Sequence, residues 1–380
     1  MQASPGRRAL RHVGNASGID EMGETSETIR CDAAALREFT ERVLAALDVP
    51  PAEARIAADV FIEGDLRGFD SHGVARLPWF VKRIRLGLIA VQPTIRIEWL
   101  TPTTGRCDGA NGLGMVVGHR AMAACIDRAK EVGAAFLAVK GSNHFGIAGY
   151  YSSMALPFHM IGIALSNASP RVVPTGGTTG ILGTNPLSVA VPRRSGHPFI
   201  LDMSTSAVSS GKIDVKVRKG EKAPDGWVYP SVEPFLDSTG VVPMSVLQYP
   251  LGGKRETGGH KGFGLGLLVD ILSGVVAGAN VGSRLSASQT PATTSNMGHF
   301  FGALRVSGFR DEQGFDEDLS ALVRDVTSSP REPGVDRIFI PGEPEMIRRE
   351  EYLRTGVPVL PAVAKQLRQV ASDLGVDAPL

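Results

Sequence analysis

Glycine is the feature that most constrains how this chain can fold. It supplies 45 of the 380 residues, against about 7% in an average protein. The glycines follow no three-residue period, so a collagen-like rod is excluded. A glycine-rich globular chain needs many tight turns or close backbone approaches, because glycine alone adopts these conformations without steric cost.

A dinucleotide fingerprint is the first interpretation of such a chain, but no segment satisfies it. Gly112-Leu-Gly114 is followed by Gly118, which is one residue too far for G-x-G-x-x-G. Gly262-Phe-Gly264-Leu-Gly266 lies inside a predicted helix and not at the strand-to-helix turn that binds a pyrophosphate. Both are interpreted as packing glycines, and a standard Rossmann domain is disfavoured.

Composition excludes several other classes of protein. The 40 Lys and Arg balance 39 Asp and Glu, for a net charge of +1, so there is no cationic excess to bind a nucleic-acid backbone. The longest apolar segment, 263–279, contains Asp270 and is too short to span a bilayer. Three cysteines without C-x-x-C spacing favour a reducing cytoplasm over a disulfide framework or zinc ribbon. No partner nucleic acid, membrane or metal site is predicted.

Hydrophobic periodicity predicts an α/β protein in which both chain ends form a helical unit. Residues 1–28 are predicted to be a disordered tail, 29–105 the N-terminal part of a helical domain, 106–310 a central α/β domain and 311–380 the C-terminal helical part. Asp32 is the expected N-cap of the first helix. Buried strands are predicted at 134–139, 161–166, 187–191, 199–201 and 299–306, and helices at 116–132, 261–279, 316–326, 344–354 and 361–374.

Five short segments combine glycine, proline or asparagine with chemically active side chains, as in loops that carry functional sites on a rigid scaffold. They are Asp70-Ser71-His72-Gly73-Val74 with Arg76, Ser142-Asn143-His144-Phe145-Gly146, Gly183-Thr184-Asn185-Pro186, Asp202-Met203-Ser204-Thr205-Ser206 with Gly211-Lys212, and Gly258-Gly259-His260-Lys261-Gly262.

In this order the segments resemble the type-2 malate/L-lactate dehydrogenase family, from about residue 30 to the C-terminus and including Phe339-Ile-Pro-Gly-Glu343. The resemblance implies a homodimer whose cofactor domain is not a Rossmann fold. It also implies a nicotinamide cofactor, NAD or NADP, and hydride transfer to or from C2 of a small anionic 2-hydroxy or 2-oxo acid. The segment 214–244 matches the family poorly.

The resemblance also implies the catalytic residues. His72 is the first choice for the proton donor, since an imidazole titrates near neutral pH, and Ser71 would orient it. His144 is the second candidate and also a candidate for lining the cofactor. Arg76, expected on one helical face with His72, would hold the substrate carboxylate. Lys212 would stabilise an oxyanion, which favours a carbonyl over a cyclic imine as the substrate.

The implied cofactor residues are Asp202, Met203, Ser204, His260, Lys261, Gly342 and Glu343, together with His144. Several candidates also have a structural interpretation. Ser71 is a possible cap of a helix that begins near Gly73, with His72 a surface residue. His144 is a possible strand-end hydrogen-bonding residue and Asp202 a possible turn cap, whereas Arg76 and Lys261 are possible solvated side chains. The other histidines, at 12, 119, 159, 197 and 299, are interpreted as structural or surface residues. Reduction of a cyclic imino acid and non-catalytic cofactor binding stay open as alternatives.

Overall fold

The computed structural model describes residues 28–209, 212–213, 216, 221–230, 246–285 and 294–380. The predicted tail lies almost wholly outside these residues, as does much of the poorly matching segment 214–244. No helix among the described residues has the length and apolar character needed to cross a membrane.

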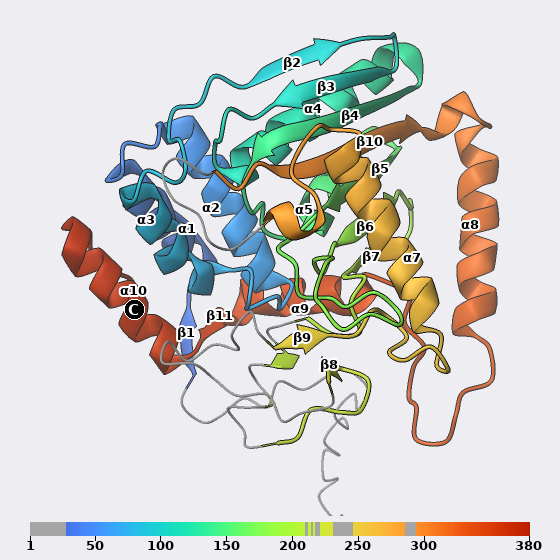
Figure 1. The fold of residues 1–380 in the computed structure, drawn as a ribbon. Coiled ribbons are helices and arrows are strands. Elements are labelled where there is room, and N and C mark those ends of the chain that lie inside the picture. Colours follow the sequence, from blue (N-terminus) through green and yellow to red (C-terminus); the bar gives the residue numbers. More distant parts are fainter. Residues whose placement is uncertain (1–27, 210–211, 214–215, 217–220, 231–245, 286–293) are drawn as a thin grey trace, which may run out of the picture.

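A seven-stranded mixed sheet forms the centre of the molecule, in the order β2-β3-β4-β10-β5-β6-β7 (Figure 1). The strands are β2 (Arg96–Trp99), β3 (Thr104–Asp108), β4 (Ala134–Ser142), β5 (Met160–Ser166), β6 (Leu187–Val191), β7 (Phe199–Met203) and β10 (Met297–Arg305). Only β3 and β4 are parallel neighbours, and the other pairs are antiparallel. A doubly wound Rossmann sheet is mostly parallel, so the predicted α/β, non-Rossmann fold is confirmed.

Helices α4 (Gly114–Val132) and α5 (Ala148–Ser153) pack on the sheet, α4 against β4 and β10, and α5 against β5 and β6. Gly162 of β5 allows this close approach, because a Cβ there would lie 2.0 Å from the carbonyl oxygen of Ser152. The chain between β4 and α5 carries the second sequence motif, so this packing fixes both ends of that loop.

The two chain ends meet through a short sheet, in which β1 (Ile29–Cys31) pairs antiparallel with β11 (Val357–Val359). Around it lie α1 (Ala33–Ala45), α2 (Pro51–Leu66), α3 (Leu77–Arg85), α9 (Glu343–Thr355) and α10 (Pro361–Leu374). Asp32 caps α1 as predicted, accepting from the backbone N–H of Ala35 at 2.9 Å. The apolar face of α1 is completely buried at Leu36, Phe39, Val43 and Leu44, each contributing about 1.5–3 kcal/mol.

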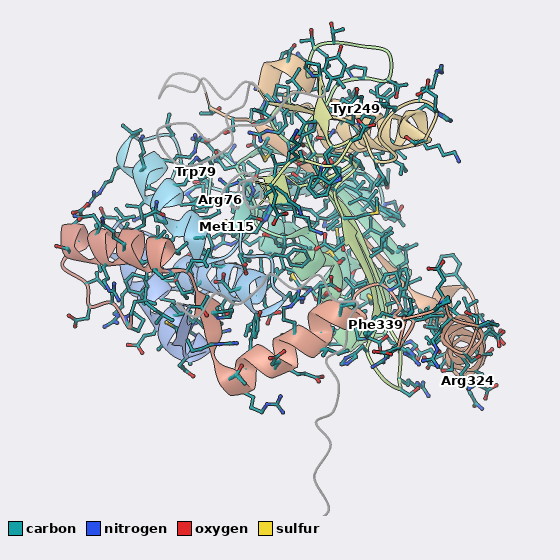
Figure 2. The ribbon with its side chains drawn as sticks, turned by 90° about the horizontal axis from the view of Figure 1, so that it is seen from below. Arg76, Trp79, Met115, Tyr249, Arg324 and Phe339 are labelled. Carbon is teal, nitrogen blue, oxygen red and sulfur yellow. The ribbon has the colours of Figure 1, made fainter. Side chains whose placement is uncertain are left out.

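Helix α8 (Glu312–Thr327) does not join the other terminal helices. It packs against the short helix at 306–308 that follows β10, and it stands at the opposite side of the molecule from α10 in both views (Figures 1 and 2). The predicted boundary at 105 also falls inside β3. Strand β2, assigned to the helical part, pairs with β3 and belongs to the large sheet.

A smaller lobe contains the two-stranded sheet of β8 (Val228–Tyr229) and β9 (Leu247–Gln248), with a separate apolar cluster around Val208 and Ile213. Helix α7 (Gly259–Asp270) continues as a π-helical segment, Ile271–Val275. It lies in front of the sheet in Figure 1. The helix predicted at 261–279 is therefore present but shorter. The strands β1, β2, β3 and β11, and helix α5, had no prediction, because short strands carry too few residues for a periodic pattern.

Candidate active site

The first motif lies in the turn between α2 and α3. The backbone N–H of His72 donates to the carbonyl oxygen of Phe69 at 2.7 Å, and Ser71 Oγ lies 2.8 Å from His72 Nδ1. A Cβ on Gly64 of α2 would lie 3.2 Å from the backbone carbonyl of His72. The turn is therefore packed directly on α2, and Ser71 occupies one of the two ring nitrogens of His72.

A buried carboxyl group packs against this turn and accepts a hydrogen bond from it. Asp65, near the end of α2, accepts from the backbone N–H of Val74 at 2.9 Å. Its oxygen lies only 1.7 Å from the position that a Cβ on Gly73 would occupy. Burial raises the pKa of Asp65 well above its ordinary value, and the neighbouring Asp70 adds to the effect. Only glycine at position 73 leaves space for this carboxyl group.

The second motif follows β4, and its backbone lies against the start of α4. A Cβ on Gly114 would lie 2.1 Å from the carbonyl oxygen of Asn143 and 2.4 Å from that of His144. The backbone N–H of Gly146 donates to His144 Nδ1 at 3.2 Å. An acceptor at Nδ1 assigns the ring hydrogen of the neutral imidazole to Nε2.

The two candidate histidines face each other. The rings of His72 and His144 stack with centroids 5.4 Å apart and planes 28° apart. Burial lowers the pKa of His72 to about 4, with Arg76 adding to the effect. Burial, His72 and Arg76 lower the pKa of His144 well below its ordinary value. Both rings are therefore neutral at neutral pH, as a proton acceptor must be.

Arg76 reaches this pair by a route different from the predicted one. His72 lies in a turn, and the 3₁₀ segment Val74–Arg76 precedes α3, so the two residues do not share a helical face. Instead Arg76 Nε donates to the carbonyl oxygen of Ser71 at 3.0 Å, which brings its guanidinium group close to both histidines. The prediction of proximity was correct, but its helical reason was wrong.

Helix α3 adds three residues beside His144 that the sequence did not single out. The rings of Trp79 and Phe80 lie 6.2 and 6.1 Å from the His144 ring. The Arg83 guanidinium lies 4.7 Å from the Trp79 ring centroid, and its charge also lowers the pKa of His144. Figure 2 shows Arg76 and Trp79 on this segment. Trp79 and Arg83 follow Arg76 by three and seven residues. This spacing predicts one helical face, and it was the signal in the sequence that could have identified them.

A cavity of about 310 Å³ lies next to the histidine turn. Its walls come from the end of α2, from β7, and from the segment that leads into α9, where Figure 2 shows Phe339. The chain passes from this wall at Phe69 to His72 within three residues. The lining combines apolar and charged side chains, as in small-molecule sites: Arg67, Phe69, Ile200, Leu201, Asp202, Phe339, Ile340, Pro341, Gly342, Pro344, Glu345 and Met346.

Two of the predicted cofactor residues, Asp202 and Gly342, line this cavity. Asp202 also accepts from the backbone N–H of Gly149, in the first turn of α5, at 2.7 Å. Burial raises the pKa of Asp202 to about 6. One carboxyl oxygen of Asp202 therefore caps a turn, as its structural interpretation expects. Gly342, with φ of +89°, has the left-handed conformation that favours glycine.

The carboxylate of Glu343, like that of Asp202, has structural partners. It is buried, pairs with Arg337, and accepts from the backbone N–H of Ile340 at 3.3 Å. This carboxylate holds the 337–340 segment, which forms one wall of the cavity. Its direct contact with a cofactor stays a prediction.

The remaining predicted residues lie on the smaller lobe or near it. Met203 ends β7, Ser204 directly follows it, and both are partly buried. Lys212, beside the buried Ile213, is exposed, as are His260 and Lys261 in the first turn of α7. The roles of these three side chains stay predictions.

The third, fourth and fifth motifs meet around α7. Asn185 Nδ2 donates to the carbonyl oxygen of Gly266 at 2.8 Å, and Thr205 Oγ1 donates to that of Asn185 at 3.1 Å. Gly149, three residues after the second motif, donates to Asp202 of the fourth. The structure therefore brings together the five motifs or the helices that directly follow them, although they are spread over nearly 200 residues of sequence.

Arg67 and Phe69 had no signal in the sequence beyond their nearness to the first motif. Arg67 is buried and pairs with Glu63, which also accepts from Arg349 of α9 at 2.9 Å. Arg67 Nη1 donates to the carbonyl oxygen of Gly149. These bonds join α2, α5 and α9 around the cavity, and such long-range pairing leaves no local pattern.

This chain is similar to known proteins over most of its length. The family model described as malate/L-lactate dehydrogenase matches residues 31–368. The chain is 41% identical to a malate dehydrogenase of Pyrococcus abyssi over 94% of this chain and 98% of that protein. It is 34% identical to a malate/(S)-sulfolactate dehydrogenase of Methanothermus fervidus over 90% and 97% of the two chains.

A solved structure gives the same result for the fold. The malate dehydrogenase of Pyrococcus horikoshii OT3 superposes with a TM-score of 0.84 at 37% identity, covering 93% of this chain and 98% of the other. The similarity therefore extends over most of the chain.

Proposed function

The chain belongs to the malate/L-lactate dehydrogenase family, and we propose from this premise how its site performs the family's chemistry. The enzyme is an NAD(P)-dependent oxidoreductase that interconverts a 2-hydroxy acid and its 2-oxo acid. The observation that carries the catalytic proposal is the stacked pair of neutral histidines, with Ser71 bonded to one ring nitrogen of His72.

His72 moves the proton at the substrate oxygen. When bound, the nicotinamide cofactor supplies the hydride acceptor or donor. In the oxidative direction the substrate hydroxyl gives its proton to the neutral imidazole of His72 as the hydride leaves C2. Ser71 holds Nδ1, so Nε2 is the nitrogen that exchanges this proton. Lys212 is proposed to stabilise the substrate oxygen when it carries negative charge.

The low pKa of His72 predicts different pH profiles for the two directions. With a pKa of about 4, the free enzyme holds the neutral base across pH 5–8, so kcat/KM for oxidation should be flat there. Reduction needs the protonated imidazole, whose fraction falls about tenfold per pH unit above the pKa. Steady-state kcat/KM measured from pH 5 to 8 in both directions tests this. A reductive kcat/KM that does not fall would contradict it.

The substrate is proposed to carry a second acidic group, as in malate. Arg76 and Arg83 both act on the pKa of His144, and they approach it from two ends of one helical segment. Arg76 would bind the C1 carboxylate next to the reacting carbon, and Arg83 a carboxylate or sulfonate at the far end. Charged hydrogen bonds of this kind place a small dianion precisely. The relatives named for malate and sulfolactate act on such dianions.

Substitution of Arg83 tests this assignment. Arg83→Leu should lower kcat/KM for malate by about 10²–10³, because the second carboxylate of malate would be buried without a partner, at a cost of about 3–5 kcal/mol. Lactate has no second carboxylate, so its kcat/KM should change less than threefold. Arg85→Leu is the matched control, because Arg85 is on the same helix, is exposed and lies 3.8 Å from Asp373. Equal losses on malate and lactate would refute the assignment.

The nicotinamide cofactor, NAD or NADP, is proposed to bind across the cavity and the neighbouring motifs. The cavity residues Asp202 and Gly342 fit this role, since an acidic group next to an apolar wall suits a ribose beside a base. Glu343, Met203, Ser204, His144, His260 and Lys261 complete the proposed set. Lys261, in the first turn of α7, is proposed to bind a phosphate, which a helix N-terminus also favours.

A homodimer is proposed through the outer face of α7. This helix buries glycines and exposes leucines: Gly262 packs on the backbone of Leu251, whereas Leu268 is 49% and Val275 62% exposed. The exposed face also includes Leu265, Leu267, Ile271 and Val276. Asp270, the one ionisable residue between Phe263 and Gly278, is buried. A helix that is apolar on its outer side needs an apolar partner, and a second copy supplies one without an unpaired charge.

Leu268→Asp on this face should convert the dimer to a monomer, because each copy would bury an unpaired carboxylate at the symmetric contact. Light scattering after size-exclusion chromatography measures the mass directly. Leu353→Asp is the control, since Leu353 is 51% exposed on α9. A wild-type mass equal to one chain would contradict the proposal.

A cytoplasmic location is proposed from the cysteines. Cys31, Cys107 and Cys125 are all free and buried, and burial raises the pKa of each thiol. Such thiols act as small apolar core residues, which suits a reducing compartment.

A cofactor-by-substrate panel tests the function as a whole. NADH and NADPH are each added with oxaloacetate, pyruvate, 3-sulfopyruvate and a cyclic imino acid, and the loss of nicotinamide absorbance is followed. We expect turnover on the 2-oxo acids, highest for the dianions. Turnover on the cyclic imine alone would favour the imine reductase instead. No turnover, together with a rise in Tm on adding cofactor, would show that the protein binds the cofactor without catalysis.

A further inference from the structure

His299 is a fully buried histidine outside the set predicted from the sequence. It lies on β10, between β4 and β5 at the centre of the large sheet, where it pairs with Val139 on one side and Ser166 on the other. The register with β4 shifts between Met297 and His299. This irregularity lies beside the end of β4, where the motif that carries His144 begins.

Both ring nitrogens of His299 have serine partners at the ends of the two neighbouring strands. Nε2 lies 2.7 Å from Ser142 Oγ at the end of β4, and Nδ1 lies 2.9 Å from Ser166 Oγ at the end of β5. Burial lowers the pKa of His299 to about 3, so the ring is neutral. A neutral imidazole has one donor and one acceptor, and two serine hydroxyls satisfy both.

The face of the His299 ring contacts the same motif at a second residue, Phe145. His299 stacks on Phe145 with centroids 4.5 Å apart and planes 3° apart. The opposite contact of Phe145 is Tyr151, at 4.8 Å and 16°, and the Tyr151 hydroxyl donates to the carbonyl oxygen of Phe145. Ser142 and Phe145 bracket His144, so one buried ring contacts the chain on both sides of it.

We propose that His299 is a positioning residue for His144 in the oxidoreductase reaction. It fixes the 142–145 segment by a hydrogen bond to Ser142 and a ring stack on Phe145, and its second hydrogen bond, to Ser166, fixes the ring itself against β5. The His144 ring is thereby held against His72. The inference rests on the proposed roles of these two histidines. The ladders of β10 with β4 and β5 already fix the strands, so the imidazole is not needed to pair them.

The chemistry of the ring supports a directional role. An apolar side chain would fill the same interior at no cost in polar burial, whereas a buried imidazole must have both nitrogens satisfied. The stack alone could be made by phenylalanine, as Phe300 on the same strand stacks on Phe136. What only His299 adds is the pair of hydrogen bonds: the bond to Ser166 orients the ring, and the bond to Ser142 sets the orientation of Ser142 and hence of the residues that follow it.

A double-mutant cycle with His144 tests the proposal. His299→Phe keeps the stack and removes both hydrogen bonds. It should lower kcat about tenfold while KM for substrate and cofactor changes less than threefold. In the His144→Ala background the same substitution should lower kcat less than twofold. His299→Gln, which keeps a donor and an acceptor, should recover part of kcat.

Ser188→Ala is the matched control, since Ser188 makes a buried 2.7 Å hydrogen bond to Ser152 in the same sheet. It should lower Tm without a comparable loss of kcat. A loss of kcat for His299→Phe that repeats in the His144→Ala background would overturn the proposal, as would an unchanged kcat. If His299→Phe does not fold, the same cycle is measured with His299→Gln. The proposal is then overturned if the effects of His299→Gln and His144→Ala on kcat are fully additive.

A second measurement separates this proposal from the function on which it rests. The imidazole ¹⁵N and ¹H NMR signals of His144 should shift or broaden in His299→Phe and stay unchanged in Ser188→Ala. If the wild-type enzyme turns over no substrate, the proposed reaction fails, but these signals still decide whether His299 holds His144. Unchanged His144 signals in His299→Phe overturn the positioning role.

Discussion

His72→Ala is expected to lower kcat by about 10²–10⁴ while cofactor affinity changes little. The substitution removes the one group proposed to exchange a proton with the substrate oxygen, and general acid–base catalysis contributes a factor of this size. The cavity next to the turn is formed by other residues, so the cofactor keeps its contacts. Steady-state kinetics and a fluorescence titration with NADH or NADPH measure the two quantities separately.

Two variants control this result. His119→Asn removes a partly buried histidine on α4 that lies 3.3 Å from the Tyr150 hydroxyl, and it should leave kcat within about threefold. His144→Ala should retain the pH dependence of reduction if His72 carries the proton. If His72→Ala keeps full turnover and His144→Ala loses it, the acid–base role belongs to His144.

Gly73→Ala is expected to be nearly as damaging to kcat, by at least about 10², and to lower the free energy of unfolding by about 1–3 kcal/mol or more. The new methyl group would lie 1.7 Å from a carboxyl oxygen of Asp65, which is buried and bonded to Val74. The φ of Gly73 is −87°, so the cost is steric overlap and not backbone strain. To relieve it, the turn that carries His72 must move.

Chemical denaturation and kcat measured on the same protein test both parts. Gly308→Ala is the matched control, because a Cβ there meets no atom within 4 Å, and surface substitutions of this kind stay within about 0.5 kcal/mol. A Gly73→Ala enzyme with wild-type stability and turnover would show that the Asp65 carboxyl does not hold the turn.

Much of the fold could be predicted because its longer elements have periodic apolar patterns. Strand β6 and helix α10 occupy the residues predicted for them, 187–191 and 361–374. The short strands β1 and β11 could not be found this way. Three residues carry no usable period, and these strands exist because Ile29 and Val359 meet across more than 300 residues of chain.

The candidate site divides in the same way. His72 and His144 stand out in the sequence because they follow polar residues in short glycine-containing loops. Asp65, Arg83 and His299 do not, because nothing local separates a buried functional group from an ordinary helix or strand residue. Arg76 illustrates the difference: its nearness to His72 was predicted, but the hydrogen bond to the Ser71 carbonyl that creates it depends on a turn.

The sequence by itself determined the family, the α/β class and the order of the motifs, because these depend on residue type and spacing along the chain. Only the tertiary structure decided which groups meet: the stacked histidines, the Asp65 carboxyl beneath Gly73, the α3 face beside His144, and the ring of His299 behind its loop. These contacts join residues from different elements. Their geometry is set by packing distances of a few ångströms, which a linear pattern does not encode.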